Sequence, residues 1–155
     1  MEVSIVKADV SHCKEIHAMQ IVSFKDLLEK YKDYETNPGS ESVDMIAKKM
    51  NDKYTDFYFI VLEDKKIGVI RVVRLSDQEC RIANMFILPE YQGCGYAKKI
   101  LKQVELLYPW AKIWGLDTIK QEKKLCYLYE SMGYKLTGRE EIIKDGMTIV
   151  FYQKE

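Results

Sequence analysis

The feature that most constrains the fold is a glycine-containing loop between a predicted strand and a predicted helix. Residues 81–88 are rich in apolar and β-branched side chains and predict a strand. Residues 89–95 predict a loop, and from Tyr96 apolar residues recur at helical spacing until Pro109. The first main-chain N–H groups of such a helix lack partners and carry partial positive charge. The junction therefore predicts a place for an anionic group such as a pyrophosphate.

Small residues in the loop support this interpretation. Gly93 and Gly95 remove side chains that would block a phosphate, Ala97 keeps the first helical turn small, and Lys98 would add charge at the rim. A glycine-rich turn before an ordinary helix remains an alternative. A dinucleotide-binding loop is another, because Asp117 lies about where that fold needs an acid, but its third glycine is replaced by Lys98. A Gly-Lys-Ser/Thr phosphate loop is absent.

The remaining hydrophobic patterns predict an α/β (α+β) architecture. Asp9 or Ser11 would cap a first helix, and Gly133 stands where a left-handed helix end favours glycine. The order of elements predicts a mixed, mostly antiparallel sheet of about seven strands, with about four helices on both faces. The predicted strands are residues 3–7, 57–62, 67–75, 81–88, 113–118, 134–143 and 147–153, and the helices lie before Asn37 and at 42–50, 96–108 and 122–132.

Length and composition narrow the class of protein. The 155 residues suit a single domain, residues 1–155, and the 47% of apolar residues allow a sizeable core. The 24 basic and 24 acidic residues cancel, so we expect no general nucleic-acid binding. No apolar run reaches the roughly 18–20 residues of a membrane helix, and no secretory signal is visible. Four separated cysteines and two histidines predict reduced thiols, no metal site and a cytoplasmic location.

Two segments resemble the GNAT family of acetyltransferases. Residues 92–97, Gln-Gly-Cys-Gly-Tyr-Ala, are similar to its Gln/Arg-x-x-Gly-x-Gly/Ala signature, and residues 86–91 are similar to the strand and turn that lead into it. Residues 128–134, Leu-Tyr-Glu-Ser-Met-Gly-Tyr, resemble its Leu-Tyr-Glu-x-x-Gly-Phe/Tyr segment. The resemblance covers residues 81–134 closely, and the predicted element order matches the family. It implies a GNAT-like acyl-CoA N-acyltransferase fold.

The resemblance also implies an activity and a cosubstrate. The expected reaction is direct transfer of the acetyl group of acetyl-CoA to a primary amine, on a small molecule or a protein, without a metal. The main chain of residues 85–87 would pair with the pantetheine arm like one more strand, and residues 93–98 would hold the pyrophosphate through N–H groups. The implied cofactor-binding residues are Met85, Phe86, Ile87, Gln92, Gly93, Cys94, Gly95, Tyr96, Ala97 and Lys98.

Acetyl transfer to an amine requires that the amine lose a proton, and the departing thiolate benefits from gaining one. Tyr129 matches the family tyrosine that faces the cofactor sulfur, so the resemblance implies that Tyr129 is the general acid. Without the motif, Tyr129 would be interpreted as an aromatic residue of the core. Asp117 lies where some members of the family carry a glutamate that acts as the base. Two alternatives remain: ordered water takes the proton in some members, and the aspartate could simply cap the turn after its strand. Glu122 stands where many members have asparagine, and a carboxylate there could cap the following helix.

Other functions remain open at this stage. A non-catalytic sensor on the same fold would bind acyl-CoA without turnover. A nucleotide-binding enzyme would prefer NADH or ATP to acetyl-CoA, and a purely structural interaction module would bind none of these ligands. The amine is not indicated, since polyamines, aminoglycosides, amino acids and protein amines all fit. Acidic residues within 26–41 would attract a cationic amine, although a solvated helix face is the plainer interpretation. An exposed edge on the last strands would allow a homodimer.

Overall fold

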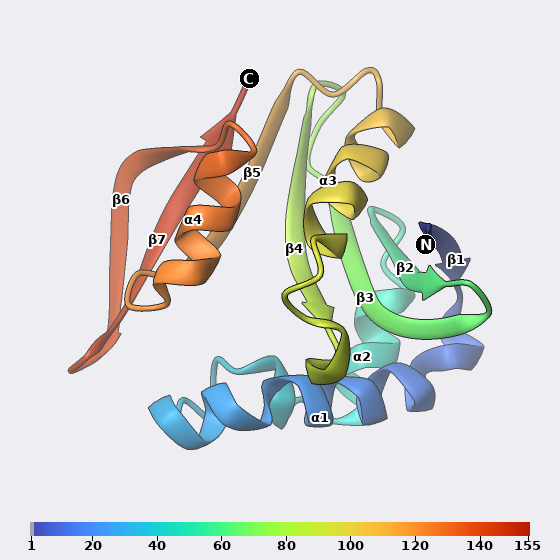
Figure 1. The fold of residues 1–155 in the computed structure, drawn as a ribbon, viewed down its shortest axis with the longest axis horizontal. Coiled ribbons are helices and arrows are strands. Elements are labelled where there is room, and N and C mark those ends of the chain that lie inside the picture. Colours follow the sequence, from blue (N-terminus) through green and yellow to red (C-terminus); the bar gives the residue numbers. More distant parts are fainter. Residues whose placement is uncertain (1) are drawn as a thin grey trace.

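The computed structural model describes residues 2–155, which form one seven-stranded sheet flanked by four α-helices (Figure 1). The strand order is β1-β2-β3-β4-β5-β7-β6, and every neighbouring pair is antiparallel except β4 and β5. The strands are β1 (Val3–Ala8), β2 (Thr55–Leu62), β3 (Lys65–Arg74), β4 (Glu79–Ile87), β5 (Ile113–Ile119), β6 (Lys135–Lys144) and β7 (Met147–Lys154). The helices are α1 (Cys13–Tyr31), α2 (Val43–Met50), α3 (Tyr96–Leu107) and α4 (Lys123–Ser131). The predicted mixed sheet and helices are confirmed.

Helix ends follow the local sequence signals. The Asp9 carboxylate accepts the N–H of Ser11 at 2.9 Å and caps a short 3-10 turn that leads into α1. Ser42 caps α2 in the same way, since its hydroxyl accepts a main-chain N–H of the first turn at 3.2 Å. Gly133 follows α4 with φ +94°, the left-handed conformation that glycine adopts most readily. None of the helices within residues 2–155 is long and apolar enough to cross a membrane.

The helices cover both faces of the sheet. On one face, Ile16 of α1 and Ile46 of α2 are almost fully buried against alternate side chains of β2, β3 and β4. On the opposite face, Ile100 and Leu101 of α3 pack in a larger cluster that also contains Tyr129 of α4. Because strand residues point alternately to the two faces, each apolar strand supplies both clusters. Figure 1 shows α1 below the sheet, α2 behind the lower part of β3, and α3 and α4 in front of the sheet.

The sheet opens in its middle, between β4 and β5. These parallel strands pair only at one end, where residues 79–81 meet residues 113–115. The register of β4 against β3 then shifts, so that Ala83 has no partner on β3, and this bulge turns the strand. Beyond it β4 and β5 diverge, as Figure 1 shows, while β5 continues to pair with β7 as far as Ile119. Within the described part of the chain, residues 82–87 of β4 thus have no strand partner on the side that faces β5.

Candidate active site

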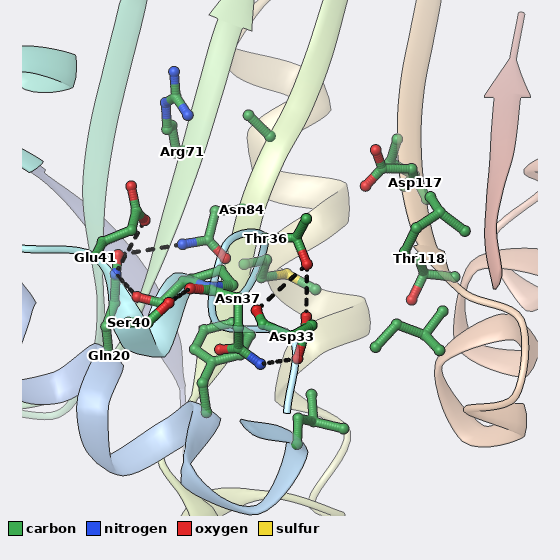
Figure 2. Close-up of a pocket in the computed structure, with 18 of the residues that line it drawn as sticks. Gln20, Asp33, Thr36, Asn37, Ser40, Glu41, Arg71, Asn84, Asp117 and Thr118 are labelled. Carbon is green, nitrogen blue, oxygen red and sulfur yellow. Dashed lines mark hydrogen bonds between the residues drawn. The ribbon is translucent and has the colours of Figure 1, made fainter. Parts of the chain in front are cut away.

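A cavity of about 670 Å³ lies at this opening. Its walls come from the end of α1 and the loop that follows, from α2, from strands β3 to β5 and from α4. Figure 2 shows Arg71 and Asn84 on the strands of one side and Asp117 and Thr118 on the strand of the other. Tyr129 of α4 also lines the cavity, although its helix packs on the opposite face of the sheet. The cavity therefore connects the two faces through the gap.

The glycine loop follows β4 directly and leaves open space before α3. Gly93 and Gly95 have φ values of +76° and +82°, and a Cβ added to either would meet no atom within 4 Å. Gly95 is the residue before α3, and no side chain within residues 2–155 caps that helix start. The unpartnered N–H groups of the first turn therefore face a space that no side chain of this loop fills. This arrangement fits a pyrophosphate, as the loop sequence predicts.

The other residues predicted to bind the cofactor surround this loop. Cys94 is exposed, Tyr96 and Ala97 are half-buried in the first turn of α3, and the Lys98 ammonium lies 5.7 Å from the centre of the Tyr127 ring on α4. Lys98 thus lies at the rim between the two helices. The structure brings these residues together at one end of β4, and their binding role stays a prediction.

Gln92 has a structural contact that the motif did not reveal. Its Nε2 donates a hydrogen bond to the main-chain oxygen of Ile87 at 2.7 Å. The side chain therefore closes the loop back onto the end of β4. This bond fixes the loop relative to the strand, which is a way to support a binding site without touching the ligand.

Residues 85–87 form the last part of β4. Phe86 and Ile87 are buried and Met85 is half-buried, and the three pair with β3 on one side. Their side chains pack in the two clusters, whereas their main chain lies beside the gap that faces β5. Side-chain packing and main-chain binding can thus occur together at these positions.

Tyr129 has an unengaged hydroxyl at the cavity. Its ring is 7% exposed and packs edge-on against Tyr134, with centroids 6.3 Å apart. The hydroxyl makes no hydrogen bond within residues 2–155, and the residue lines the cavity. Burial, followed by the negative charge of Asp117, raises the pKa of Tyr129. The hydroxyl therefore stays protonated at neutral pH, and its role as a general acid stays a prediction.

Asp117 lies across the gap, two residues before the end of β5. Its Oδ2 accepts a hydrogen bond from Nη2 of Arg81 at 2.6 Å, so one carboxylate oxygen is engaged and Oδ1 is not part of that bond. Arg81 reaches from β4 and bridges the two strands where they begin to diverge. The sequence analysis did not identify this partner, because the two residues are 36 positions apart and neither belongs to a motif.

Glu122 does not cap α4, which corrects the expectation from the sequence. It is the residue before the helix, but its carboxylate makes no cap hydrogen bond. It instead accepts hydrogen bonds from the Tyr31 hydroxyl and from the Lys30 ammonium, at 2.7 Å for the latter. Burial alone would raise the pKa of Glu122, but the bonds from Lys30 and Tyr31 bring it below its usual value. The carboxylate therefore joins the end of α1 to the start of α4.

The loop after α1 was expected to be a solvated charged face, and this is only partly right. Tyr34 and Glu35 are exposed, as expected. Asp33 is 7% exposed and accepts hydrogen bonds from the Thr36 hydroxyl at 2.8 Å and the Asn37 amide at 3.2 Å (Figure 2). These bonds fold the loop into a fixed wall of the cavity.

Comparison with known proteins decides the family. The model of the GNAT acetyltransferase domain matches residues 54–136, which is more than half of the chain and includes the glycine loop and Tyr129. The chain belongs to the GNAT acetyltransferase family. It is an acetyl-CoA-dependent N-acetyltransferase, and the prediction from the two motifs is confirmed. No curated protein sequence matches the chain.

Solved GNAT-type structures share its fold at low sequence identity. An acetyltransferase from Thermus thermophilus has a TM-score of 0.77 at 9% identity, over 99% of this chain and 97% of that one. The PaiA N-acetyltransferase of Thermoplasma acidophilum, solved with coenzyme A, has a TM-score of 0.72 at 15% identity, over 100% and 99% of the chains. A GNAT acetyltransferase from Elizabethkingia anophelis with acetyl-CoA bound has a TM-score of 0.67 at 14% identity, over 99% and 97%. These likenesses show the shared fold alone.

Proposed function

We propose that this GNAT enzyme, as one domain over residues 1–155, transfers acetyl directly from acetyl-CoA to a primary amine held between β4 and β5. The observation that carries the proposal is the cavity at the open edge of β4, which Tyr129 and Asp117 both line. The glycine loop lies at the end of the same strand. One end of the site can thus hold an anionic cosubstrate while the other admits an acceptor.

Main-chain groups would hold the cosubstrate. The N–H groups of residues 93–98 would bind its pyrophosphate, and the unpaired edge at residues 85–87 would pair with its pantetheine arm. The open space before Gly93 and Gly95 supports this placement. When bound there, acetyl-CoA supplies the thioester that is attacked. A main-chain N–H of Phe86 or Ile87 would donate to the thioester carbonyl oxygen. No step requires a metal, and within residues 2–155 no three metal-ligating side chains gather.

Two side chains would manage the protons. The amine must be neutral to attack, and the Oδ1 of Asp117, or an ordered water beside it, would accept its proton. The Tyr129 hydroxyl would act as the general acid and protonate the departing sulfur. Because burial raises the pKa of Tyr129, the hydroxyl carries its proton at neutral pH before the transfer begins.

Replacing Tyr129 tests this assignment. Tyr129→Phe should lower kcat by roughly 10²- to 10⁴-fold, the usual contribution of a positioned acid or base, while acetyl-CoA binding measured by calorimetry is unchanged. Tyr127→Phe is the matched control, since Tyr127 lies on the same helix with 70% of its side chain exposed. Full turnover in Tyr129→Phe would reject the role of this tyrosine.

A second experiment tests binding. Wild-type protein should bind acetyl-CoA in preference to NADH or ATP, and Gly95→Glu should lose that binding because its side chain would enter the open space before α3. Binding of acetyl-CoA with no transfer to any amine would favour the sensor instead. Preference for NADH or ATP would favour a nucleotide-binding enzyme.

The proposal includes a homodimer formed through β6. This strand is one of the two edge strands of the sheet, and Leu136 and Ile142 are 59% and 81% exposed on it. Unpaired strand edges with apolar side chains favour association. Light scattering should give the mass of two chains, and Ile142→Lys should give the mass of one; a monomeric wild-type protein would contradict the proposal.

A further inference from the structure

Arg71 is a cation of the cavity wall that forms no ion pair with any carboxylate of residues 2–155. It lies on β3 and is half-buried, and its Nε is inaccessible and has no hydrogen-bond partner within residues 2–155. The neighbouring arginines differ, since Arg74 lies 3.2 Å from Asp56 and Arg81 lies 2.6 Å from Asp117. In Figure 2 Arg71 stands above the other labelled groups of its wall with no hydrogen bond drawn to it. The structure thus leaves one guanidinium of the site without a counterion.

Its position in the sheet aims Arg71 into the cavity. Arg71 is the middle member of a row across three strands, with Phe57 of β2 on one side and Asn84 of β4 on the other. Residues in such a row point to the same face of the sheet, here the face that α1 and α2 cover. The guanidinium lies 5.7 Å from the centre of the Phe57 ring. An aromatic ring beside the planar guanidinium limits its freedom and fixes the direction of its donors.

The carboxylates of the cavity do not serve as its partner. Glu41 is ion-paired with Lys49, and Asp117 is ion-paired with Arg81. Burial lowers the pKa of Arg71, whereas the more distant charges of Glu41 and Asp52 oppose that effect. A guanidinium nevertheless remains charged in proteins. A desolvated charge without a partner is unfavourable, so an anion that enters the cavity gains from meeting it.

We propose that the acceptor is an amine that carries a carboxylate on the same small molecule, as an amino acid does, and that Arg71 binds this carboxylate. The inference rests on the proposed acetyl transfer and specifies its acceptor. The flat fork of the guanidinium matches a carboxylate through two parallel hydrogen bonds. A phosphate can also accept two parallel hydrogen bonds from the guanidinium. Its second negative charge, however, would lie near the acids Asp33, Glu41 and Asp117 of the same cavity. A singly charged carboxylate fits that surrounding better.

The distances between strands suit one small molecule. β3 is hydrogen-bonded to β4, about 4.8 Å away, and the far edge of β4 opens onto the gap. A carboxylate on Arg71 can therefore belong to the molecule whose nitrogen reaches the gap. In the reaction the amine nitrogen forms a bond to the acetyl carbon as the thioester C–S bond breaks. One proton leaves the nitrogen and one proton ends on the sulfur, and the carboxylate is unchanged.

Matched pairs of amines test the proposal. The standard L-amino acids, β-alanine and 4-aminobutyrate are each offered beside the corresponding carboxamide, which keeps the shape and removes the charge. Wild-type enzyme should prefer the best carboxylate over its carboxamide by roughly 10- to 100-fold in kcat/KM, the range for a hydrogen bond to a charged group. Arg71→Gln should abolish this preference mainly through KM, and Arg71→Lys should retain part of it. Arg139→Gln is the control, since Arg139 is exposed on β6 and paired with Glu141.

A binding measurement makes the test independent of turnover. The Nε–Hε signal of Arg71 in an arginine-labelled protein, assigned by its loss in Arg71→Lys, should shift with the carboxylates and not with the carboxamides. A wild-type enzyme without carboxylate preference, or a signal that moves with no carboxylate, would overturn the inference while acetyl transfer stands. If acetyl-CoA binds but no amine is acetylated, the proposed function fails, and the signal still decides whether Arg71 binds a carboxylate.

Discussion

Replacing Gly68 by alanine should deform β4, the strand that we propose pairs with the cosubstrate. Gly68 lies on β3 opposite Ile87 of β4, and a Cβ built on it would lie 2.2 Å from the main-chain oxygen of Phe86. Real Cβ contacts are at least 3.0 Å, so the two strands must separate by about 0.8 Å at this point. The obstacle is main chain, and therefore no side-chain rotation can relieve it.

The cost follows from this displacement. Overpacking a close-packed interior destabilises by about 1–3 kcal/mol, and a main-chain obstacle places Gly68→Ala at the upper end, about 3 kcal/mol. For a domain of this size that corresponds to a Tm lower by roughly 6–12 °C. Because β4 also carries Phe86 and Ile87, acetyl-CoA affinity should fall by about tenfold or more, since small displacements of a binding group are costly.

Gly115→Ala is the matched control. Gly115 is also a strand glycine, on β5, but a Cβ there would meet nothing nearer than the main-chain oxygen of Tyr152 at 3.9 Å. Its Tm should stay within about 2 °C of the wild-type value. Scanning calorimetry gives both Tm values, and titration calorimetry gives the acetyl-CoA affinity. A Gly68→Ala protein that melts and binds like the wild type would mean that β3 and β4 do not approach closely at Gly68.

Three further perturbations test other contacts. Burial raises the pKa of Tyr129 above its ordinary value, so ionisation of its hydroxyl should not lower the kcat of the wild-type enzyme below about pH 10. A fall in kcat near pH 8 that is absent in Tyr129→Phe would contradict this. Burial alone would raise the pKa of Asp56, but hydrogen bonds from Lys7 and Tyr108 hold it below its ordinary value. The stability that the Asp56 carboxylate contributes is therefore fully present above the pKa of the unfolded chain, and it is lost as pH falls through the lower pKa of the folded protein. Urea unfolding of Asp56→Asn should accordingly lose part of the acid dependence seen below about pH 4, and an unchanged dependence would speak against these bonds. Tyr31→Phe should lower the free energy of unfolding in urea by about 1–2 kcal/mol, since it removes the hydroxyl bond between α1 and the start of α4; no change would mean that this bond contributes nothing.

Much of the fold was predictable because the ends of helices depend on adjacent residues. Gly95 and Gly133 both adopt positive φ, which glycine does at little cost, so the start of α3 and the end of α4 could be located. The loop and Tyr129 were predictable for a different reason, since they lie in motifs that resemble those of a family. The sequence therefore led to the end of the site where we propose that the cosubstrate binds.

The acceptor end was not predictable, because its contacts join residues far apart in the chain. Glu122 was expected to cap its own helix, yet its partner Tyr31 lies 91 residues away. Arg71 lies in a strand whose local pattern is that of any buried strand. Its proposed role becomes visible only when Phe57 and Asn84 flank it on neighbouring strands and the cavity carboxylates Glu41 and Asp117 are ion-paired with other residues. No local signal carries such information.

The short pairing of β4 with β5 also has a mechanical consequence. Within the described chain, residues 79–81 and 113–115 form the only main-chain ladder between the β1–β4 half of the sheet and the half that contains β5 to β7. Because this ladder has so few hydrogen bonds, the free energy needed to separate the two halves should be lower than the free energy needed to unfold either half. Hydrogen exchange of the β5 amides would detect this local opening. A cosubstrate wedged between the halves adds contacts to both and, at roughly 100 times its Kd, stabilises the closed form by about 2.7 kcal/mol. The resistance of this protein to proteases in a cell should therefore rise and fall with the supply of acetyl-CoA.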